Sequence, residues 1–135
     1  MTSPKPSDLE LQVLSVLWQS GPSTARQVRQ AMPDGKRRAY TTVLSVLQVM
    51  EKKGLVTHTS KGLAHVYRPA VSRRRVLRPL LRSLVTNVFG GSPASAMAHL
   101  LSETDVSDSE LRQIRKLLKK HGGDAKSGHG GESRQ

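Results

Sequence analysis

The chain has 135 residues, with 22 lysines and arginines against 10 aspartates and glutamates, a net charge of +12 and no cysteine. This length suits one domain, or a small domain with an appendage, and the lack of cysteine excludes disulfides, thiolate metal sites and cysteine nucleophiles. Residues 1–6 read as a flexible arm without the apolar stretch of a secretion signal. The longest uncharged run, residues 83–102, is broken by glycine and proline, which argues against a membrane helix. We therefore expect a cytoplasmic protein.

The positive charge is concentrated in one segment. Between Arg26 and Arg82 there are 14 basic and two acidic residues, so this segment carries the whole net charge of the chain. Such a patch most often neutralises the phosphates of a nucleic acid. The alternative, a surface charged for solubility, would spread the charge evenly along the chain. The uneven distribution favours a nucleic-acid partner.

Two helices are predicted near the N-terminus from their capping signals. Ser7 and Glu10 form a capping box, in which each side chain bonds the other residue's backbone amide, and a Ser-Gly-Pro stop ends that helix at residues 20–22. Thr24 and Gln27 form a second box, which opens a helix that runs to about residue 32.

A third helix is predicted from about Tyr40 to Lys53, with Gly54 as its C-terminal cap. Its apolar stripe consists of Val43, Val46, Leu47 and Met50. The opposite face is polar, short and uncharged, and consists of Thr41, Thr42, Ser45 and Gln48. Since these residues include poor helix formers, a solvated face alone does not account for their choice.

A hairpin is predicted after the third helix. Residues 55–60 and 63–68 have strand composition, and Lys61-Gly62 reads as a two-residue loop between them. In that register His58 faces His65 across the strands. A divalent metal could bridge the pair, although no third ligand is in view, and the alternative is polar packing. Three helices followed by a basic hairpin predict a winged helix-turn-helix over residues 7–71.

The remaining chain is predicted to be helical from 72 to 121 and disordered from 122 to 135, where glycines accumulate. Pro79 should kink the first of these helices or mark its first turn. About 50 residues in helices bury little apolar surface by themselves, so we expect these helices to pair with those of a second copy. The alternative is that they fold back on their own domain. The fold class is thus mainly α with a small β-hairpin, a winged helix-turn-helix followed by a helical dimerisation region. The residues expected at the dimer contact are Leu77, Leu80, Leu81, Leu84, Val88, Phe89, Met97, Leu100, Leu101, Leu111, Ile114 and Leu118.

No arrangement of residues indicates catalysis. The paired carboxylates near helix ends are explained as caps, and the glycines lie at turns or in the tail rather than in a phosphate-binding loop. We therefore predict that the chain is not an enzyme and has no catalytic residue, bound metal or cofactor.

The third helix carries the sharpest functional signal. A helix that enters the major groove needs small or polar side chains that can approach the base edges. The residues expected to read bases are Thr41, Thr42, Ser45 and Gln48. The residues expected to contact the DNA backbone, from the helices and the wing, are Arg26, Arg37, Arg38, Tyr40, Lys52 and Lys61.

The residues also carry a family resemblance. The sequence AYTTV at residues 39–43, followed by Lys53-Gly54-Leu55-Val56, resembles the recognition-helix signature of the BlaI/MecI/CopY (penicillinase repressor) family. The resemblance covers nearly all of residues 7–120. The other matching features are Leu9-Glu10, Leu17-Trp18, the wing Lys61-Gly62 with Tyr67-Arg68-Pro69, Phe89-Gly90-Gly91-Ser92, and Ser107 with Glu110-Leu111. The resemblance implies a homodimeric bacterial repressor that binds a palindromic operator through the third helix.

Three departures from the family pattern limit what the resemblance implies. Val49 stands where members commonly have a basic residue, which removes one expected phosphate contact. Residues 98–100 read Ala-His-Leu, without the Asn-Phe bond that is cleaved in the best-studied members, so release by antibiotic-triggered proteolysis is not expected. The C-terminal cysteines of the copper-responsive relatives are also missing.

The sequence therefore predicts a dimeric repressor whose partners are double-stranded operator DNA and a second copy, released by an inducer or protease that the sequence does not identify. Two rivals remain open at this point. A sequence-independent architectural or RNA-associated protein would be indifferent to DNA sequence. A protein-interaction adaptor would use the basic segment on an acidic partner and would not bind duplex DNA at moderate ionic strength.

Overall fold

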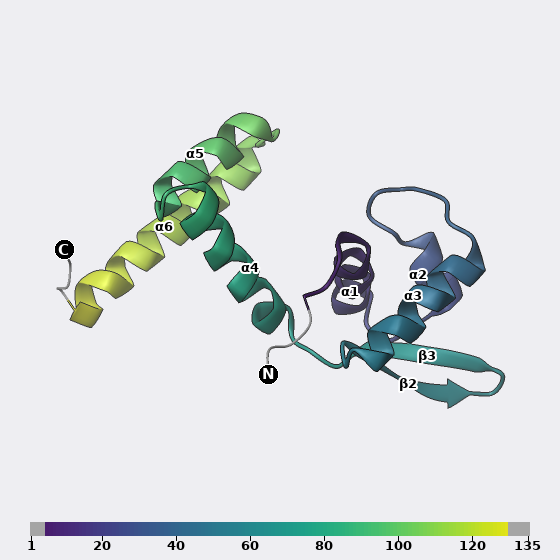
Figure 1. The fold of residues 1–135 in the computed structure, drawn as a ribbon. Helices are drawn as coiled ribbons and strands as arrows, with labels where there is room; N and C mark the ends of the chain where they lie inside the picture. Colours follow the sequence, from purple (N-terminus) through teal and green to yellow (C-terminus); the bar gives the residue numbers. More distant parts are fainter. Residues whose placement is uncertain (1–4, 130–135) are drawn as a thin grey trace. The chain divides into compact units, whose positions relative to one another are not determined.

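The computed structural model describes residues 5–129 and contains six helices and three strands in that range (Figure 1). Residues 1–4 of the predicted arm and 130–135 of the predicted tail lie outside it. The chain forms two units, an N-terminal unit up to Ser83 and a C-terminal unit from Leu84 onward. The elements are α1 (Asp8–Ser20), β1 (Ser23–Thr24), α2 (Ala25–Gln30), α3 (Tyr40–Lys52), β2 (Val56–Lys61), β3 (Ala64–Pro69), α4 (Arg73–Val88), α5 (Pro93–Glu103) and α6 (Asp108–His129).

Both predicted capping boxes are present in the structure. Ser7 Oγ accepts a hydrogen bond from the Glu10 amide at 3.2 Å, and Glu10 Oε1 accepts one from the Ser7 amide at 2.9 Å. Thr24 and Gln27 repeat this pair of bonds at 3.2 and 2.9 Å at the start of α2. These bonds satisfy amides that the first helical turn leaves without partners. The local sequence alone thus fixes where two helices begin.

The core of the N-terminal unit lies between the apolar faces of its helices and the small sheet. Of the predicted stripe on α3, Val43, Leu47 and Met50 are buried, and Val46 is half-buried at the core's edge. The remaining buried apolar residues of this core are Val13, Leu14, Val16, Leu17, Ala25, Val28, Met32, Leu55, Val56, Tyr67 and Val76. Burial of the inner face of α3 leaves its polar face toward solvent.

The first half of α4 belongs to the N-terminal unit. Val76 is buried in the core, and Leu80, one of the residues expected at a dimer contact, packs against it in part. Trp18 Nε1 donates a hydrogen bond to the carbonyl of Val71 at 3.0 Å, and the Arg73 guanidinium lies 5.7 Å from the centre of the Trp18 ring. The unit boundary therefore lies inside α4, beyond the predicted boundary at residue 72.

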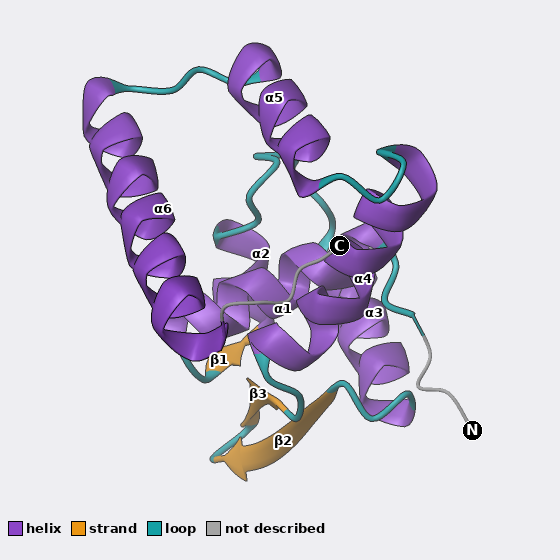
Figure 2. Cartoon of the chain, turned by 90° about the vertical axis from the view of Figure 1, so that its left-hand side faces the viewer, coloured by secondary structure: helices purple, strands orange, loops and turns teal. Residues whose placement is uncertain are grey.

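The sheet is antiparallel with the strand order β1-β3-β2, and β3 packs against α1 (Figure 2). β1 was not expected from the sequence, because it consists of only two residues, which is too short to show a strand pattern. Both of them pair with β3. The predicted register of the hairpin is wrong. Lys61 pairs with Ala64 and His58 with Tyr67, so the loop consists of Gly62 and Leu63 rather than Lys61 and Gly62.

Glycine conformation explains the shift of the hairpin loop. Gly62 has φ of +64°, and no described residue other than glycine has a positive φ. A two-residue hairpin loop with positive φ only at its first position is a type II′ turn, which favours glycine there. Placing Gly62 first in the loop moves every cross-strand partner by two positions, so each side chain keeps its face of the sheet.

The C-terminal unit contains the end of α4 with α5 and α6. Ser92 Oγ caps α5 by accepting from the Ser95 amide at 3.0 Å, with Pro93 in the first turn as predicted. The Phe89 and His99 rings lie 5.1 Å apart, which joins the end of α4 to α5. No residue from 84 to 123 is buried. The described part of this unit therefore leaves much of the apolar surface of its helices exposed.

Two further predictions about helix limits differ from the structure. Pro79 lies inside α4, so it does not mark the first turn of that helix. α6 continues to His129, and the first eight residues of the predicted disordered tail, 122–129, are helical. The sequence is polar and rich in glycine there, a composition that does not favour a helix. Within residues 5–129 no helix is both long and apolar enough to cross a membrane.

A partly buried ion pair ties the first helix to the segment after α3. Glu10 is 5% exposed, and Lys53 Nζ donates to both of its carboxylate oxygens at 3.0 and 2.9 Å. Burial acts to raise the pKa of Glu10, but hydrogen bonds from the Ser7 amide and from Lys53 outweigh it and hold this pKa below its ordinary value of 4.5. The ionised form of Glu10 is therefore favoured by folding.

We expect this ion pair to make the N-terminal unit sensitive to acid. Because the folded pKa of Glu10 is lowered, its contribution is complete above pH 4.5 and is lost as the pH falls through the folded pKa. The variant Glu10→Gln should be less stable at pH 7 by roughly 1 kcal/mol, and should lose less stability than the wild type on acidification. Urea unfolding followed by Trp18 fluorescence measures both, and parallel pH profiles would refute the assignment.

Candidate DNA interface

The outer face of α3 presents side chains that are both polar and uncharged. Thr41, Thr42, Ser45 and Gln48 are all exposed, while the opposite face of the helix is buried in the core. The structure gives none of these four side chains a hydrogen-bond partner within the described residues. The N-cap residue Ala39 supplies no side-chain bond to the first turn of α3, although its carbonyl accepts from the Thr42 amide at 3.1 Å.

A groove separates α3 from the wing formed by β2 and β3. It has a volume of about 240 Å³, and α2, α3 and β3 all contribute to it. The Arg26 guanidinium lies 5.7 Å from the centre of the Tyr40 ring, a cation–π contact that fixes the start of α3 beside α2. The residues that line the groove are Thr24, Ala25, Arg26, Tyr40, Leu44, Gln48, Leu63, Ala64, His65 and Tyr67.

The predicted phosphate-binding cations surround this face. Arg37 precedes α3, Lys52 ends it and Lys61 ends β2, and all three side chains are exposed. Within residues 5–129, none of the three is paired with a carboxylate. Their charge is therefore available to an external anion.

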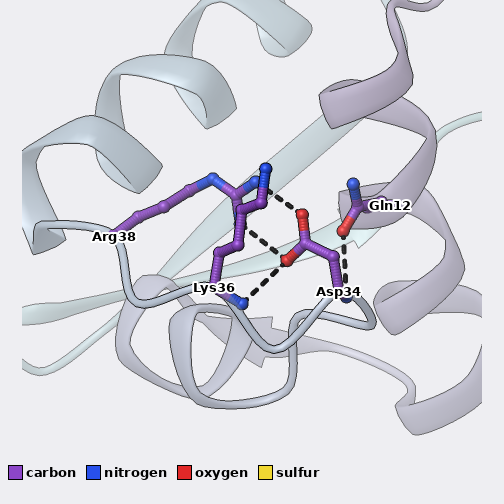
Figure 3. Close-up of polar contacts among 4 residues, drawn as sticks. All are labelled: Gln12, Asp34, Lys36 and Arg38. Carbon is purple, nitrogen blue, oxygen red and sulfur yellow. Dashed lines mark hydrogen bonds and ion pairs between the residues drawn. The ribbon is translucent and has the colours of Figure 1, made fainter.

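Arg38 differs from the other predicted phosphate-binding residues because it already has an anionic partner. Its Nη2 and Nη1 atoms donate to the two carboxylate oxygens of Asp34 at 2.7 and 3.1 Å (Figure 3). The backbone amide of Lys36 also donates to Asp34 Oδ1 at 3.0 Å. The hydrogen bonds from Arg38, and then that from Lys36, hold the pKa of Asp34 far below its usual range.

The two histidines of the wing are neighbours, but not a directly opposed pair as predicted. His58 opposes Tyr67 in the sheet, and its ring stacks on the His65 ring with centroids 4.2 Å apart. His58 Nδ1 lies 2.8 Å from Glu51 Oε1, which links the wing to the end of α3. Burial, followed by the charge of Glu51, raises the pKa of Tyr67, so the phenol stays neutral at physiological pH.

A metal bridge between the histidines gains no support from this geometry. The part of the chain that the structure describes holds no group of three or more histidine, cysteine, aspartate or glutamate residues able to bind a metal ion. The carboxylate near His58 instead serves to join the wing to α3.

Sequence reasoning missed the roles of both acidic residues in the basic segment. Asp34 pairs with Arg38 and Glu51 with His58, so both acids contact side chains of the same segment. The spacing between Asp34 and Arg38 was a usable signal, because residues four apart often pair. No comparable signal linked Glu51 to His58, because that contact depends on how β2 leaves the helix.

Comparisons with known proteins agree with this arrangement. The family model for the penicillinase repressor matches residues 6–120. The transcriptional regulator BlaI of Mycobacterium tuberculosis is 34% identical over 119 residues, covering 85% of this chain and 86% of the relative. The penicillinase repressor of Bacillus licheniformis is 23% identical over 118 residues, covering 87% and 92% of the two chains.

A solved structure with similarity to this chain is also known. It is the solution structure of monomeric Bacillus licheniformis BlaI in complex with the blaP half-operator, which is 26% identical with a TM-score of 0.46 and covers 54% of this chain and 89% of that chain. The family assignment rests on sequence, because the family model extends over most of the chain and the mycobacterial regulator aligns with most of it. This chain therefore belongs to the penicillinase repressor family, whose members are transcriptional regulators and not enzymes.

Proposed function

We propose that this protein is a homodimeric transcriptional repressor that blocks a promoter by binding a palindromic operator. In this proposal α3 enters the major groove of each half-site, the groove beside the wing receives the DNA backbone, and the C-terminal units join the two chains. Membership of the penicillinase repressor family supports the general function. The surfaces of the two units support the mode of binding.

The observation that carries the proposal is the composition of the exposed face of α3. Thr42 and Ser45 offer hydroxyl groups and Gln48 an amide, with no internal partner described for any of them. Hydroxyl groups donate to or accept from base edges, the threonine methyl contacts thymine methyls, and glutamine pairs with adenine in bidentate fashion. Thr41 completes the polar face that we propose reads the bases.

The cations around α3 support backbone contacts on both sides of the reading helix. Arg26, Arg37, Lys52 and Lys61 lie on α2, the loop before α3, the end of α3 and the wing. Phosphate contacts from separate elements fix the register and orientation of a protein on the duplex. The phenol of Tyr40, exposed beside Arg26, is placed to contribute one such contact.

The C-terminal unit supports the dimer. Helices that bury no residue within the described unit gain little stability from their own packing. A second copy would cover the same faces on both chains by twofold symmetry. The large apolar residues most exposed there are Leu84, Val88, Leu100, Leu101, Leu117 and Leu118.

The proposal is tested by finding which DNA fragments the protein binds and which bases it protects. Fragments of the organism's genomic DNA are captured with the full-length chain and then footprinted with DNase I. We expect protection of an element with dyad symmetry, whose half-sites are one or two helical turns apart, roughly 34 Å each. Capture of all fragments without a protected symmetric element would contradict the proposal.

Salt dependence provides a second prediction. The logarithm of the affinity should fall linearly with the logarithm of the salt concentration, with a slope of about −0.9 for each phosphate contacted. Because the dimer loses one contact in each half-site, Arg37→Gln and Lys61→Gln should each make the slope shallower by about 1.8, while weakening binding to all duplexes alike. Fluorescence anisotropy at several KCl concentrations measures this. If the variants have the same slope as the wild type, Arg37 and Lys61 do not contact phosphates.

A further inference from the structure

The loop between α2 and α3 is closed by one carboxylate. Asp34 binds the guanidinium of Arg38 through both oxygens, and it also accepts the amide of Lys36, two residues further along the loop (Figure 3). An arginine–carboxylate pair of this kind fixes orientation as well as distance. These bonds hold residues 34–38 in one tight turn, which contains Lys36 and Arg37.

Both ends of this turn are also attached to neighbouring helices. The amide of Asp34 donates to Gln12 Oε1 on α1 at 3.3 Å, as Figure 3 shows. The carbonyl of Arg38 accepts a hydrogen bond from Arg29 Nε on α2. The turn is therefore fixed to α1 at its beginning and to α2 at its end, where only Ala39 separates Arg38 from the first residue of α3.

We propose that Asp34 and Arg38 form a latch that positions Lys36 and Arg37 for the DNA backbone, and that Arg38 acts through this latch rather than by touching a phosphate. The inference rests on the proposed function and deepens it. Lys36 and Arg37 are exposed and have no carboxylate partner within the described residues. A loop that is ordered before binding loses less conformational entropy when it meets its partner.

The latch and a direct phosphate contact by Arg38 predict opposite effects of removing the Asp34 charge. If Arg38 bound phosphate, Asp34 would compete with the DNA, and Asp34→Asn should strengthen binding. If the latch positions the loop, the same change should weaken specific binding even though it removes a negative charge near the DNA. The ionised carboxylate is present at every pH of interest, because the pKa of Asp34 is held far below its usual range by Arg38.

The experiment uses the full chain and the duplex that it protects in the footprint, beside a random duplex of equal length. Asp34→Asn, Arg38→Gln and the double variant are titrated by anisotropy at several KCl concentrations. We expect each single variant to lose about five- to tenfold in affinity for the protected duplex, and the double variant to lose no more than one single change. Affinity for the random duplex should fall by a comparable factor, because backbone contacts are made to any sequence.

Arg38→Lys separates the latch from a simple charge effect. Lysine keeps the positive charge but cannot make the two-pronged bond to a carboxylate. The latch therefore predicts that Arg38→Lys loses most of the affinity lost by Arg38→Gln, without a change in the salt slope. The matched control is Arg37→Gln on the adjacent residue, which should make the slope shallower by about 1.8, one contact being lost from each chain of the dimer.

Several results would overturn the latch. These are unchanged or tighter binding by Asp34→Asn, wild-type affinity in Arg38→Lys, or additive losses in the double variant. Urea unfolding monitored by Trp18 should be nearly unchanged in each variant, because an exposed ion pair contributes little to global stability. A wild-type chain that prefers no duplex would refute the proposed function itself, whereas specific binding that Asp34→Asn leaves intact would refute only the latch.

Discussion

Leu84→Glu combined with Leu118→Glu is expected to convert the protein into a monomer at micromolar concentration and to weaken operator binding by about 100-fold or more. These leucines are 46% and 61% exposed in a unit without a buried residue between positions 84 and 123. A charge at each would have to be buried in the proposed dimer contact, which is costly without a partner. The loss of affinity follows because a dimer binds its second half-site at high effective concentration.

The matched control for this variant is Thr86→Glu with Gln113→Glu. Both control residues are exposed, and they lie on α4 and α6, the same helices as the two leucines. The net charge change is identical, so a general effect of negative charge on DNA binding would appear in both variants. Sedimentation velocity gives the oligomeric state and anisotropy the affinity. A leucine variant that sediments as the wild type and binds as tightly would exclude this contact.

Thr42→Ala combined with Ser45→Ala should abolish most of the preference for the operator while sparing non-specific binding. Both hydroxyls are exposed on α3, and the two substitutions leave the buried face of the helix intact. Loss of two base contacts in each half-site, at roughly 1 kcal/mol each, corresponds to about a 30-fold fall in specific affinity for each half-site. Affinity for a random duplex should stay within about twofold, because the phosphate contacts are retained.

The comparison of the two duplexes decides whether these hydroxyls read bases. The matched control, Thr86→Ala with Ser109→Ala, removes the same two groups from exposed positions of the C-terminal unit and should bind as the wild type. An equal loss for the operator and for the random duplex would assign Thr42 and Ser45 to the backbone instead. No loss for either duplex would remove them from the interface.

Local signals in the sequence predicted the helical elements of the N-terminal unit well. The reciprocal bonds of Ser7 with Glu10 and of Thr24 with Gln27 involve residues three apart, so neither depends on the rest of the fold. The buried face of α3 follows from helical periodicity, which leaves Thr42 on the exposed face. The amino-acid sequence alone was therefore sufficient to locate the proposed reading face.

Features that depend on the competition between neighbouring residues were harder to predict. Lys61-Gly62 and Gly62-Leu63 both suit a two-residue loop, and the choice rests on the positive φ of Gly62 at the first position. Leu80 packs against the core because of the direction in which α4 leaves the sheet. The apolar periodicity of α4 shows which residues share a face but not what that face contacts, so this contact could not be predicted. For the same reason the predicted boundary at residue 72 lies before the observed one.

The charged side chains show the same limit. Arg37 and Arg38 are adjacent arginines that a count of charges treats alike. Within the described residues only Arg38 has a carboxylate partner, because Asp34 lies four residues before it in a tight turn. A count of charges therefore locates the basic segment correctly but does not distinguish a cation that is free for phosphate from one that shapes a loop.

The most direct test of a dimer on a symmetric operator is the stoichiometry of the complex. Sedimentation equilibrium of the full chain with a fluorescently labelled duplex, containing the footprinted element and little flanking DNA, measures how many chains bind at saturation. The account predicts two chains on each duplex. Saturation at one chain, or loading that continues to rise without reaching a plateau, would contradict it.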